Sequence, residues 1–224
     1  MIRENQSPIF ATQKSICMKY SLLLIASLIS LGASAQNDPA AKKVLDGVGA
    51  KVKAAKGIIA NCQLVSISSK GKQTGTKAIT VSMKGEKYVV KQGKLEVICD
   101  GQNVYSFDGE KTITKTSVAE SNNSLNPQKL LSGAYDKDFT YKLLSTPGKF
   151  HEIEMKPLDT RKNFSKINLF IDKTKSSIAS AKIMDKSNNV TEFKILNMNF
   201  SAVLADNMFV FNKAKYPKDV EILD

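Results

Sequence analysis

The sequence has few of the residues on which catalysis and metal binding depend. It contains no tryptophan, three cysteines and a single histidine, His151. A zinc site needs about four ligands from histidine, cysteine or carboxylate side chains, and one histidine with distant cysteines does not supply them. The chain also lacks a Gly-x-Ser-x-Gly elbow, a phosphate-binding loop and a carboxylate pair set apart by its spacing. We therefore predict a protein that is not an enzyme and that uses no metal or other cofactor.

A short apolar run near the start of the chain predicts export. From Met18 the chain has one positive charge at Lys19 and then an apolar run over 22–31. Small residues follow at 33–35. This order is typical of a secretory signal peptide, and the run is shorter than the ~20 residues that span a bilayer. A buried core helix is the alternative interpretation, and we expect cleavage after Ala35.

This processing would divide the chain into three parts. Residues 1–17 form an upstream extension, consistent with a misassigned start codon, and residues 18–35 form the signal peptide. Residues 36–224 then form a single exported domain, whose length suits one sizeable core. Cys17 lies before the apolar run, so no lipid-attachment cysteine follows the cleavage point. We expect a free protein in the periplasm.

The other two cysteines, Cys62 and Cys99, would enter a compartment in which disulfides can form. If the strands follow one another as a meander, the two lie about three strands apart. At ~4.8 Å per strand this is roughly 14 Å, whereas a disulfide needs Cα atoms within about 7 Å. We therefore predict two buried thiols.

Positive charge is in excess, with 33 Lys and Arg against 21 Asp and Glu and a net charge of +12. Such an excess can indicate nucleic acid, anionic lipid or an acidic partner. The lysines are dispersed, without a run of five or more, and export argues against nucleic acid. We interpret the charge mainly as a solvated surface, with attraction to an anionic membrane as the alternative.

One amphipathic helix is predicted at the start of the exported part. Asp38 is a suitable N-cap and Pro39 suits the first helical position. Apolar residues then recur at three- and four-residue spacing from Ala41 to Ala55, and Gly57 stands where a C-terminal cap would lie. The apolar stripe predicts packing against the core.

After this helix the apolar pattern changes to a period of two, which predicts β-strands. Short connections such as Asp100-Gly101 and Asp108-Gly109 are typical of hairpins, so the strands should form an antiparallel meander. A capped short helix is expected at 126–131, and a helical turn at 202–206. The expected strands are 58–68, 76–83, 87–92, 95–99, 104–107, 112–116, 139–144, 150–155, 165–171, 178–184 and 190–196, with 209–211 and 220–222 closing the sheet.

These elements predict an α+β fold that is mainly antiparallel β. A flat sheet rarely holds about eleven strands, so the sheet should curve strongly into an incomplete barrel covered by a lid of short helices. Its strands carry more apolar side chains than two short helices easily cover, which predicts a hydrophobic cavity. The alternation leaves open which strand face points inward, and for any single residue a place in the core is the alternative. The cavity and lid candidates are Met83, Tyr88, Val90, Tyr105, Phe107, Leu130, Leu131, Phe139, Tyr141, Ile153, Met155, Ile167, Leu169 and Phe193.

Several segments resemble one known family in their order and spacing. The chain is similar, over essentially its whole exported part, to the periplasmic outer-membrane lipoprotein carrier proteins (LolA), especially those of Bacteroidetes type. The segments that carry the resemblance are Asp38-Pro-Ala-Ala-Lys-Lys-Val-Leu-Asp, Met83-Lys-Gly-Glu-Lys-Tyr88, Ile98-Cys-Asp-Gly-Gln-Asn-Val-Tyr105, Asn126-Pro-Gln-Lys-Leu-Leu131, Glu154-Met-Lys-Pro157, Ile167-Asn-Leu-Phe-Ile-Asp172, and Phe209 through Tyr216-Pro217 to Val220-Glu221.

The resemblance implies a LolA-like half-barrel that carries the acyl chains of lipoproteins, or lipids, to the outer membrane. The implied partners are an inner-membrane lipoprotein-releasing transporter and an outer-membrane acceptor, and the carrier itself would be a monomer. The implied lid spans 126–134. In proteobacterial members an arginine in the corresponding turn contacts the lid. Lys84 is its nearest counterpart here and is therefore the lid-contact candidate, although lysine lacks the planar fork of arginine.

Two other functions remain open. An envelope stress sensor, regulatory and lipid-binding, could use the same fold, as anti-sigma-factor regulators use a related half-barrel. A hydrolase would require that the fold bring Asp or Glu residues together in a pocket.

Overall fold

The structure is a computed structural model that describes residues 37–121, 126–131, 135–144 and 148–224. Residues Asn37–Asp224 group into one unit by their internal contacts. The predicted extension, signal peptide and cleavage point lie outside the described residues, as does the expected end of the lid at 132–134. No helix among the described residues is both long and apolar enough to cross a membrane.

The element order follows the predicted sequence of helix, strands, short helices and further strands. The elements are α2 (Pro39–Ala54), β1 (Ile58–Ile67), β2 (Gln73–Lys84), β3 (Lys87–Gln92), β4 (Leu95–Cys99), β5 (Asn103–Phe107), β6 (Thr112–Ser117), α3 (Val118–Ser121), α4 (Pro127–Leu131), β7 (Phe139–Leu144), β8 (Phe150–Pro157), β9 (Phe164–Asp172), β10 (Ser177–Asp185), β11 (Val190–Asn199), the 3₁₀ turns η1 (Asp206–Phe209) and η2 (Lys213–Lys215), and β12 (Glu221–Leu223).

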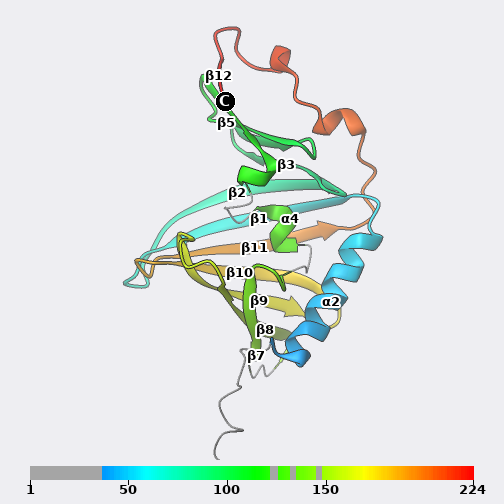
Figure 1. Cartoon of the computed structure of the whole chain (residues 1–224), viewed down its shortest axis with the longest axis vertical. Helices are drawn as coiled ribbons and strands as arrows, with labels where there is room; N and C mark the ends of the chain where they lie inside the picture. Colours follow the sequence, from blue (N-terminus) through cyan, green and yellow to red (C-terminus); the bar gives the residue numbers. More distant parts are fainter. Residues whose placement is uncertain (1–36, 122–125, 132–134, 145–147) are drawn as a thin grey trace, which may run out of the picture. The chain divides into compact units, whose positions relative to one another are not determined.

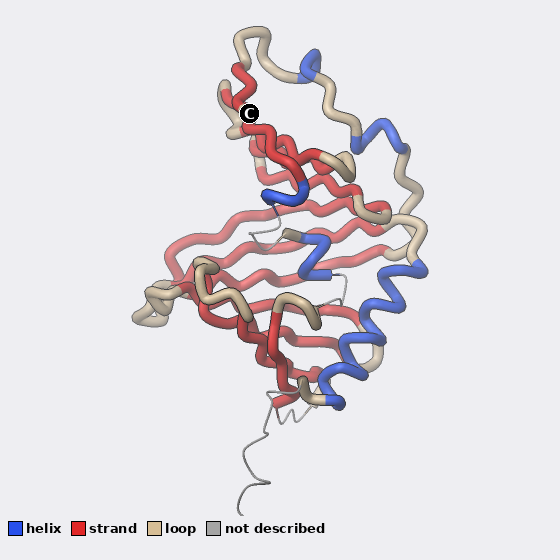
Figure 2. Tube along the Cα trace, in the orientation of Figure 1, coloured by secondary structure: helices blue, strands red, loops and turns tan. Residues whose placement is uncertain are grey.

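The described strands form one sheet with the order β12-β6-β5-β4-β3-β2-β1-β11-β10-β9-β8-β7 (Figures 1 and 2). Strands β1 to β6 form one meander and strands β7 to β11 form a second. The two meanders join where β1 pairs with β11. The two edges, β12 and β7, do not meet, so the sheet is open. The predicted fold class, mainly antiparallel β with a few helices, is confirmed.

The C-terminal end of the chain departs from the expected elements: the helical turn expected at 202–206 was misplaced, because the turn η1 begins only at Asp206. The expected strand at 209–211 was wrong, because Phe209 closes the 3₁₀ turn η1 and the residues after it join no strand. The expected final strand is present as β12, which makes twelve strands in place of about eleven. It pairs in parallel with β6, through Glu221 beside Thr112. A parallel pair needs a long connection; here β7–β11 lie between the two strands in the chain, and the segment after β11 returns to β6.

Helix α2 begins as predicted but ends earlier. The Asp38 carboxylate accepts hydrogen bonds from Ala40 N at 2.8 Å and Ala41 N at 3.4 Å, which confirms it as the N-cap. The helix ends at Ala54 without the predicted glycine cap. Gly57 instead forms a bridge to Ser201, so its role is close packing between two backbones.

The edge strand β7 is covered by the residues before α2. Asp38 N donates to Tyr141 O at 3.2 Å, and the Asp38 carboxylate accepts from Leu143 N at 2.9 Å. The Asn37 side chain accepts from Tyr141 N at 3.0 Å. Unpaired edge groups invite pairing with other chains, so this cover both fixes α2 and shields the edge.

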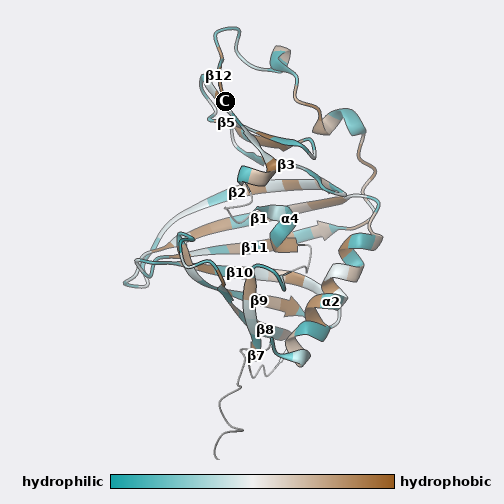
Figure 3. Ribbon diagram, in the orientation of Figure 1, coloured by the Kyte–Doolittle hydropathy of each residue, from teal (hydrophilic) through white to brown (hydrophobic). Residues whose placement is uncertain are grey.

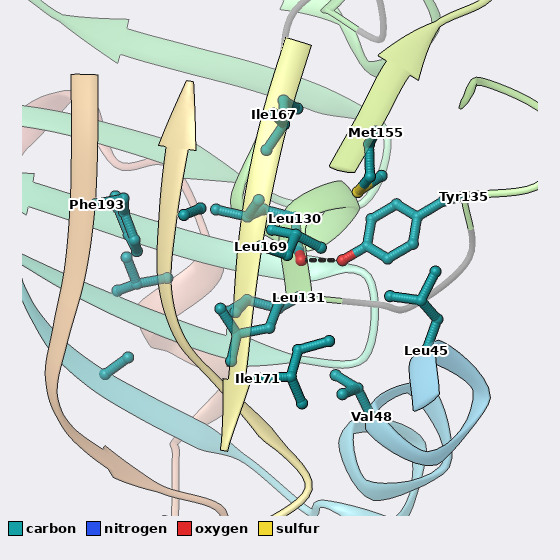
Figure 4. Packing of buried hydrophobic residues seen from close by; sticks show 14 of the residues in the cluster. Leu45, Val48, Leu130, Leu131, Tyr135, Met155, Ile167, Leu169, Ile171 and Phe193 are labelled. Atoms are coloured by element: carbon teal, nitrogen blue, oxygen red, sulfur yellow. Dashed lines mark hydrogen bonds between the residues drawn. The ribbon is translucent and has the colours of Figure 1, made fainter. Parts of the chain in front are cut away.

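Apolar side chains cover both faces of the sheet, in two separate clusters. The larger cluster joins the inner face to α2 and α4, and Figure 4 shows Leu45 and Val48 of α2 beside Leu131 of α4 and Ile171 of β9. The smaller cluster lies on the opposite face, where the C-terminal segment covers β3 and β4. Its buried members are Val89, Ile98, Ala202, Leu204 and Phe209.

Both described cysteines are buried and free, as predicted. Cys62 lies in β1 and Cys99 in β4, three strands apart in the sheet. Burial raises the pKa of the Cys62 thiol to about 12, so this thiol stays protonated at neutral pH.

Candidate functional site

The main candidate site is a cavity of about 550 Å³ on the inner face of the sheet. This volume falls within the roughly 300–1,000 Å³ of typical ligand sites. Its walls come from both meanders, and α4 lies across it (Figure 1). The lining residues are Leu64, Ile79, Val81, Tyr88, Val90, Val97, Val104, Ser106, Thr116, Ser121, Asn126, Pro127, Leu130, Ile183 and Phe193.

The lining of this cavity is apolar and uncharged. Among the lining residues that the structure describes, none is Asp, Glu, Lys, Arg or His, and the polar ones are a tyrosine, an asparagine, serines and a threonine. Along the strands that form the walls, apolar and polar residues alternate, which directs one set to each face (Figure 3). Such a cavity suits an apolar ligand that is held by burial and not by a fixed polar anchor.

Helix α4 is stabilised by hydrogen bonds at both of its ends. The Asn126 side chain is nearly buried and accepts a hydrogen bond from Lys129 N at 2.7 Å, as the predicted N-cap requires. The Tyr135 hydroxyl donates to Leu130 O (Figure 4). Leu130 therefore lines the cavity, while Leu131 packs into the core beside it.

Charged and hydroxyl groups connect the segment after α4 to α2 and β7. The Asp136 carboxylate lies 3.0 Å from Lys42 Nζ of α2 and accepts from the Tyr141 hydroxyl of β7. The Tyr141 hydrogen bond and the Lys42 ammonium hold the pKa of the Asp136 carboxyl below its ordinary value. A second ion pair joins Lys129 and Asp138 at 3.0 Å. The Lys42–Asp136 pair is solvent-exposed and therefore weak, whereas the Lys129–Asp138 pair is partly buried.

The structure brings only part of the predicted set to the cavity. Tyr88, Val90, Leu130 and Phe193 line it. Met83 lies at a smaller cavity of about 300 Å³ beside the end of α2. The remaining inner-face candidates are packed in the core cluster and do not line the cavity. They are Leu131, Phe139, Tyr141, Ile153, Met155, Ile167 and Leu169.

Two aromatic candidates point away from the cavity, contrary to the prediction. Tyr105 stacks on Phe211 with ring centroids 4.3 Å apart, and Phe107 makes an edge contact with Tyr216 at 5.0 Å. The reason is the register of β5, whose Val104 and Ser106 face the cavity. Aromatic rings from the C-terminal segment cover the other face.

The lid-contact candidate also lies elsewhere. Lys84 Nζ is 2.9 Å from the Asp206 carboxylate and donates to Leu204 O at 3.3 Å. Lys84 follows Met83 of the inner face, so strand alternation directs it to the opposite side. Lys84 thus fastens the C-terminal segment.

Sequence reasoning missed several small and medium lining residues. Val97, Val104 and Ser106 belong to strands in which larger aromatic residues drew attention to the other face. A sequence signal was available in Cys99, which was expected to be buried. Val104 pairs with Cys99 across the hairpin, and both are buried on the inner face. Helix α3, which contributes Ser121 to the lining, was not among the expected elements.

An open antiparallel sheet with a helix across an apolar cavity defines the half-barrel class of folds. The family model described as outer membrane lipoprotein carrier protein LolA matches residues 89–212, just over half of the chain. The chain belongs to this family. Its Bacteroidetes type stays a prediction.

Solved structures resemble the chain at low sequence identity. An uncharacterized conserved protein from Thermus thermophilus has the same fold and is 13% identical with a TM-score of 0.54, over 82% of this chain and 98% of that one. A LolA superfamily protein from Nitrosomonas europaea is 12% identical with a TM-score of 0.45, over 76% and 97%. The lipoprotein LppX from Mycobacterium tuberculosis is 15% identical with a TM-score of 0.43, over 75% and 100%. No curated protein matches the chain.

Proposed function

We propose that the exported protein is a periplasmic carrier that reversibly buries the acyl chains of lipoproteins, or of lipids, in the inner-face cavity. The observation that carries the proposal is the uncharged, mainly apolar lining of this ~550 Å³ cavity beneath α4. Membership of the lipoprotein carrier family supports the same function. The proposed donor is an inner-membrane lipoprotein-releasing transporter, and the proposed acceptor lies at the outer membrane.

The physical chemistry of acyl chains fits this site. Each methylene moved from water into an apolar environment gains ~0.8 kcal/mol, so a cavity of this kind can hold a chain without an ion pair. Because no described lining residue is charged, the chain can also be released to a second apolar environment, such as a membrane or an acceptor. A carrier needs both properties.

A charge placed on the lid tests the proposal. Leu130→Glu would put a carboxylate into the cavity, where an unpaired charge is strongly disfavoured beside an apolar chain. We expect binding of a fluorescent sixteen-carbon fatty acid to weaken at least tenfold. The matched control is Leu158→Glu, because Leu158 is 55% exposed and does not line the cavity.

A second variant separates ligand binding from folding. Ser106→Phe would fill part of the cavity with an apolar ring and should also weaken binding, while thermal unfolding checks that the variant is folded. Wild-type protein that binds no acyl probe, or variants that bind as well as Leu158→Glu, would contradict the proposal.

A further inference from the structure

The sheet contains a notch between β10 and β11. From the hairpin that joins them, the two strands pair from Met184 beside Val190 to Ser180 beside Lys194, and the pairing stops at Ser180 and Lys194. The first residues of β10 (Ser177 to Ala179) and the last of β11 (Ile195 to Asn199) therefore have no partner across the gap. Backbone groups of both strands are left free of this ladder.

Irregularities on both sides account for the notch. The register of β10 with β9 shifts between Ile178 and Ser180, which leaves Ala179 as an extra residue. The register of β11 with β1 shifts between Asn61 and Cys62, which leaves Leu196 as the extra residue. A bulge bends its strand and increases the local twist, so two facing bulges separate the strands.

A second cavity, of about 450 Å³, lies in this notch. Unlike the inner-face cavity, it is polar and basic. Three lysines from three different elements or turns reach it, with one acidic residue, Asp172. The lysines are Lys51 of α2, Lys149 directly before β8, and Lys175 in the turn between β9 and β10.

The lysines are held in place by specific contacts. Lys51 Nζ lies 4.6 Å from the centre of the Phe200 ring and donates to Lys175 O. Lys149 Nζ lies 3.2 Å from one Asp172 carboxylate oxygen. The other Asp172 oxygen accepts from Thr174 N and Lys175 N in the turn. The single carboxylate is thus engaged by the turn and by Lys149, and the cavity keeps an excess of positive charge.

One hydroxyl in the cavity lacks a partner. The Ser177 side chain lines the cavity, and the residue is only 8% exposed. Its hydroxyl makes no hydrogen bond with any residue that the structure describes. Every fully buried side-chain polar atom of the described residues has a partner, so this unpaired hydroxyl is open to the cavity and can donate a hydrogen bond to a ligand there.

We propose that the notch binds a compact oxyanion of the phosphate type, either free or as the headgroup of a phospholipid. Ammonium groups, the Ser177 hydroxyl and strand backbone amides are the donors that such an anion requires. The cavity exceeds the size of one phosphate and is bordered by Leu196, whose side chain is 65% exposed. This site is separate from the acyl cavity, so the inference does not depend on the proposed carrier function.

Titration of the purified protein with inorganic phosphate, followed by calorimetry, tests the inference. Wild-type protein should show saturable binding, and Ser177→Ala and Lys51→Gln should each weaken it about tenfold, as expected for loss of a hydrogen bond to a charged group. The control Lys70→Gln removes the same charge from an exposed hairpin lysine outside the notch and should leave the affinity unchanged. Ser177→Ala changes no charge, so it separates the site from general surface attraction.

Flotation with vesicles distinguishes the two sources of the anion. Vesicles of phosphatidylcholine alone are compared with equal parts of phosphatidylcholine and phosphatidylglycerol. Retention on the anionic vesicles that Ser177→Ala weakens, together with phosphate binding, identifies a lipid headgroup; phosphate binding without such retention identifies a free anion. The inference is overturned if neither probe binds saturably, or if Lys70→Gln weakens binding as much as the notch variants.

Discussion

Gly57 shows how a single residue joins the C-terminal segment to the sheet. Ala202 N donates to Gly57 O at 3.1 Å, and the backbones of Gly57 and Ser201 form a bridge. A Cβ atom on Gly57 would lie 2.5 Å from Ala202 O and 3.1 Å from the Leu204 side chain. The position therefore admits no larger residue without a shift of the backbone.

Gly57→Ala should destabilise the protein by about 1–3 kcal/mol, because the added methyl group overpacks a backbone contact. Gly47→Ala is the matched control, since Gly47 lies in α2 with no atom within 4 Å of an added Cβ. In a helix, alanine is favoured over glycine by about 1 kcal/mol, so this variant should be slightly stabilised. Urea unfolding measures both, and equal stabilities for the two variants would contradict the packing described.

Residue patterns predicted which side chains share a strand face, but not which face is inside. Tyr105 and Phe107 share a face, as predicted, yet that face is covered by Phe211 and Tyr216 from more than a hundred residues later. Pairing of distant segments decides the inner face, and a local period of two carries no information about it. The candidates in the second meander were placed on the inner face by the same kind of alternation.

At the scale of elements, the helices with local signals were predictable. Asp38 before Pro39 and Asn126 before Pro127 both cap their helices through side-chain oxygens. The pairing of strand β12 and the path of the C-terminal segment were harder to predict from the sequence, because a parallel pair depends on a distant strand and not on a turn. The notch escaped prediction for a related reason, since bulges arise from the mismatch between neighbouring strands.

The segment after α4 offers a prediction that depends on pH. Asp136→Asn removes the carboxylate that holds this segment to Lys42 and Tyr141, and should lower the melting temperature at pH 7 by roughly 1–3 °C. Because the pKa of Asp136 is lowered in the folded protein, its stabilisation is complete above about pH 4, the pKa of an unfolded carboxyl. It is lost as the pH falls through the folded value.

The difference between wild type and Asp136→Asn should therefore be constant from pH 5 to 8 and shrink as the pH falls below about 4. Asp46→Asn is the control, because Asp46 also contacts Lys42, at 3.1 Å, but lies within α2. It should have a smaller effect. A melting-temperature difference for Asp136→Asn that grows on acidification would show that this contact does not stabilise the segment.

At the scale of the whole described unit, the two meanders cooperate to make one site. Neither meander contains the inner-face cavity alone, because Val90 and Val97 come from the first, and Ile183 and Phe193 from the second. Their junction at β1 and β11 brings these walls together. Composition and strand count predicted an open, curved sheet with surplus apolar surface, but the position of the cavity depended on that junction.

The central claim, that an acyl chain occupies the inner-face cavity, is tested most directly by photo-crosslinking. A fatty acid with a photoreactive group in its chain is bound to the protein, irradiated, and mapped by mass spectrometry of peptides. We predict crosslinks at Val97, Leu130 and Ile183, which line the cavity, and their loss in Ser106→Phe. Crosslinks confined to the opposite face, at Tyr105 or Phe211, would contradict the claim.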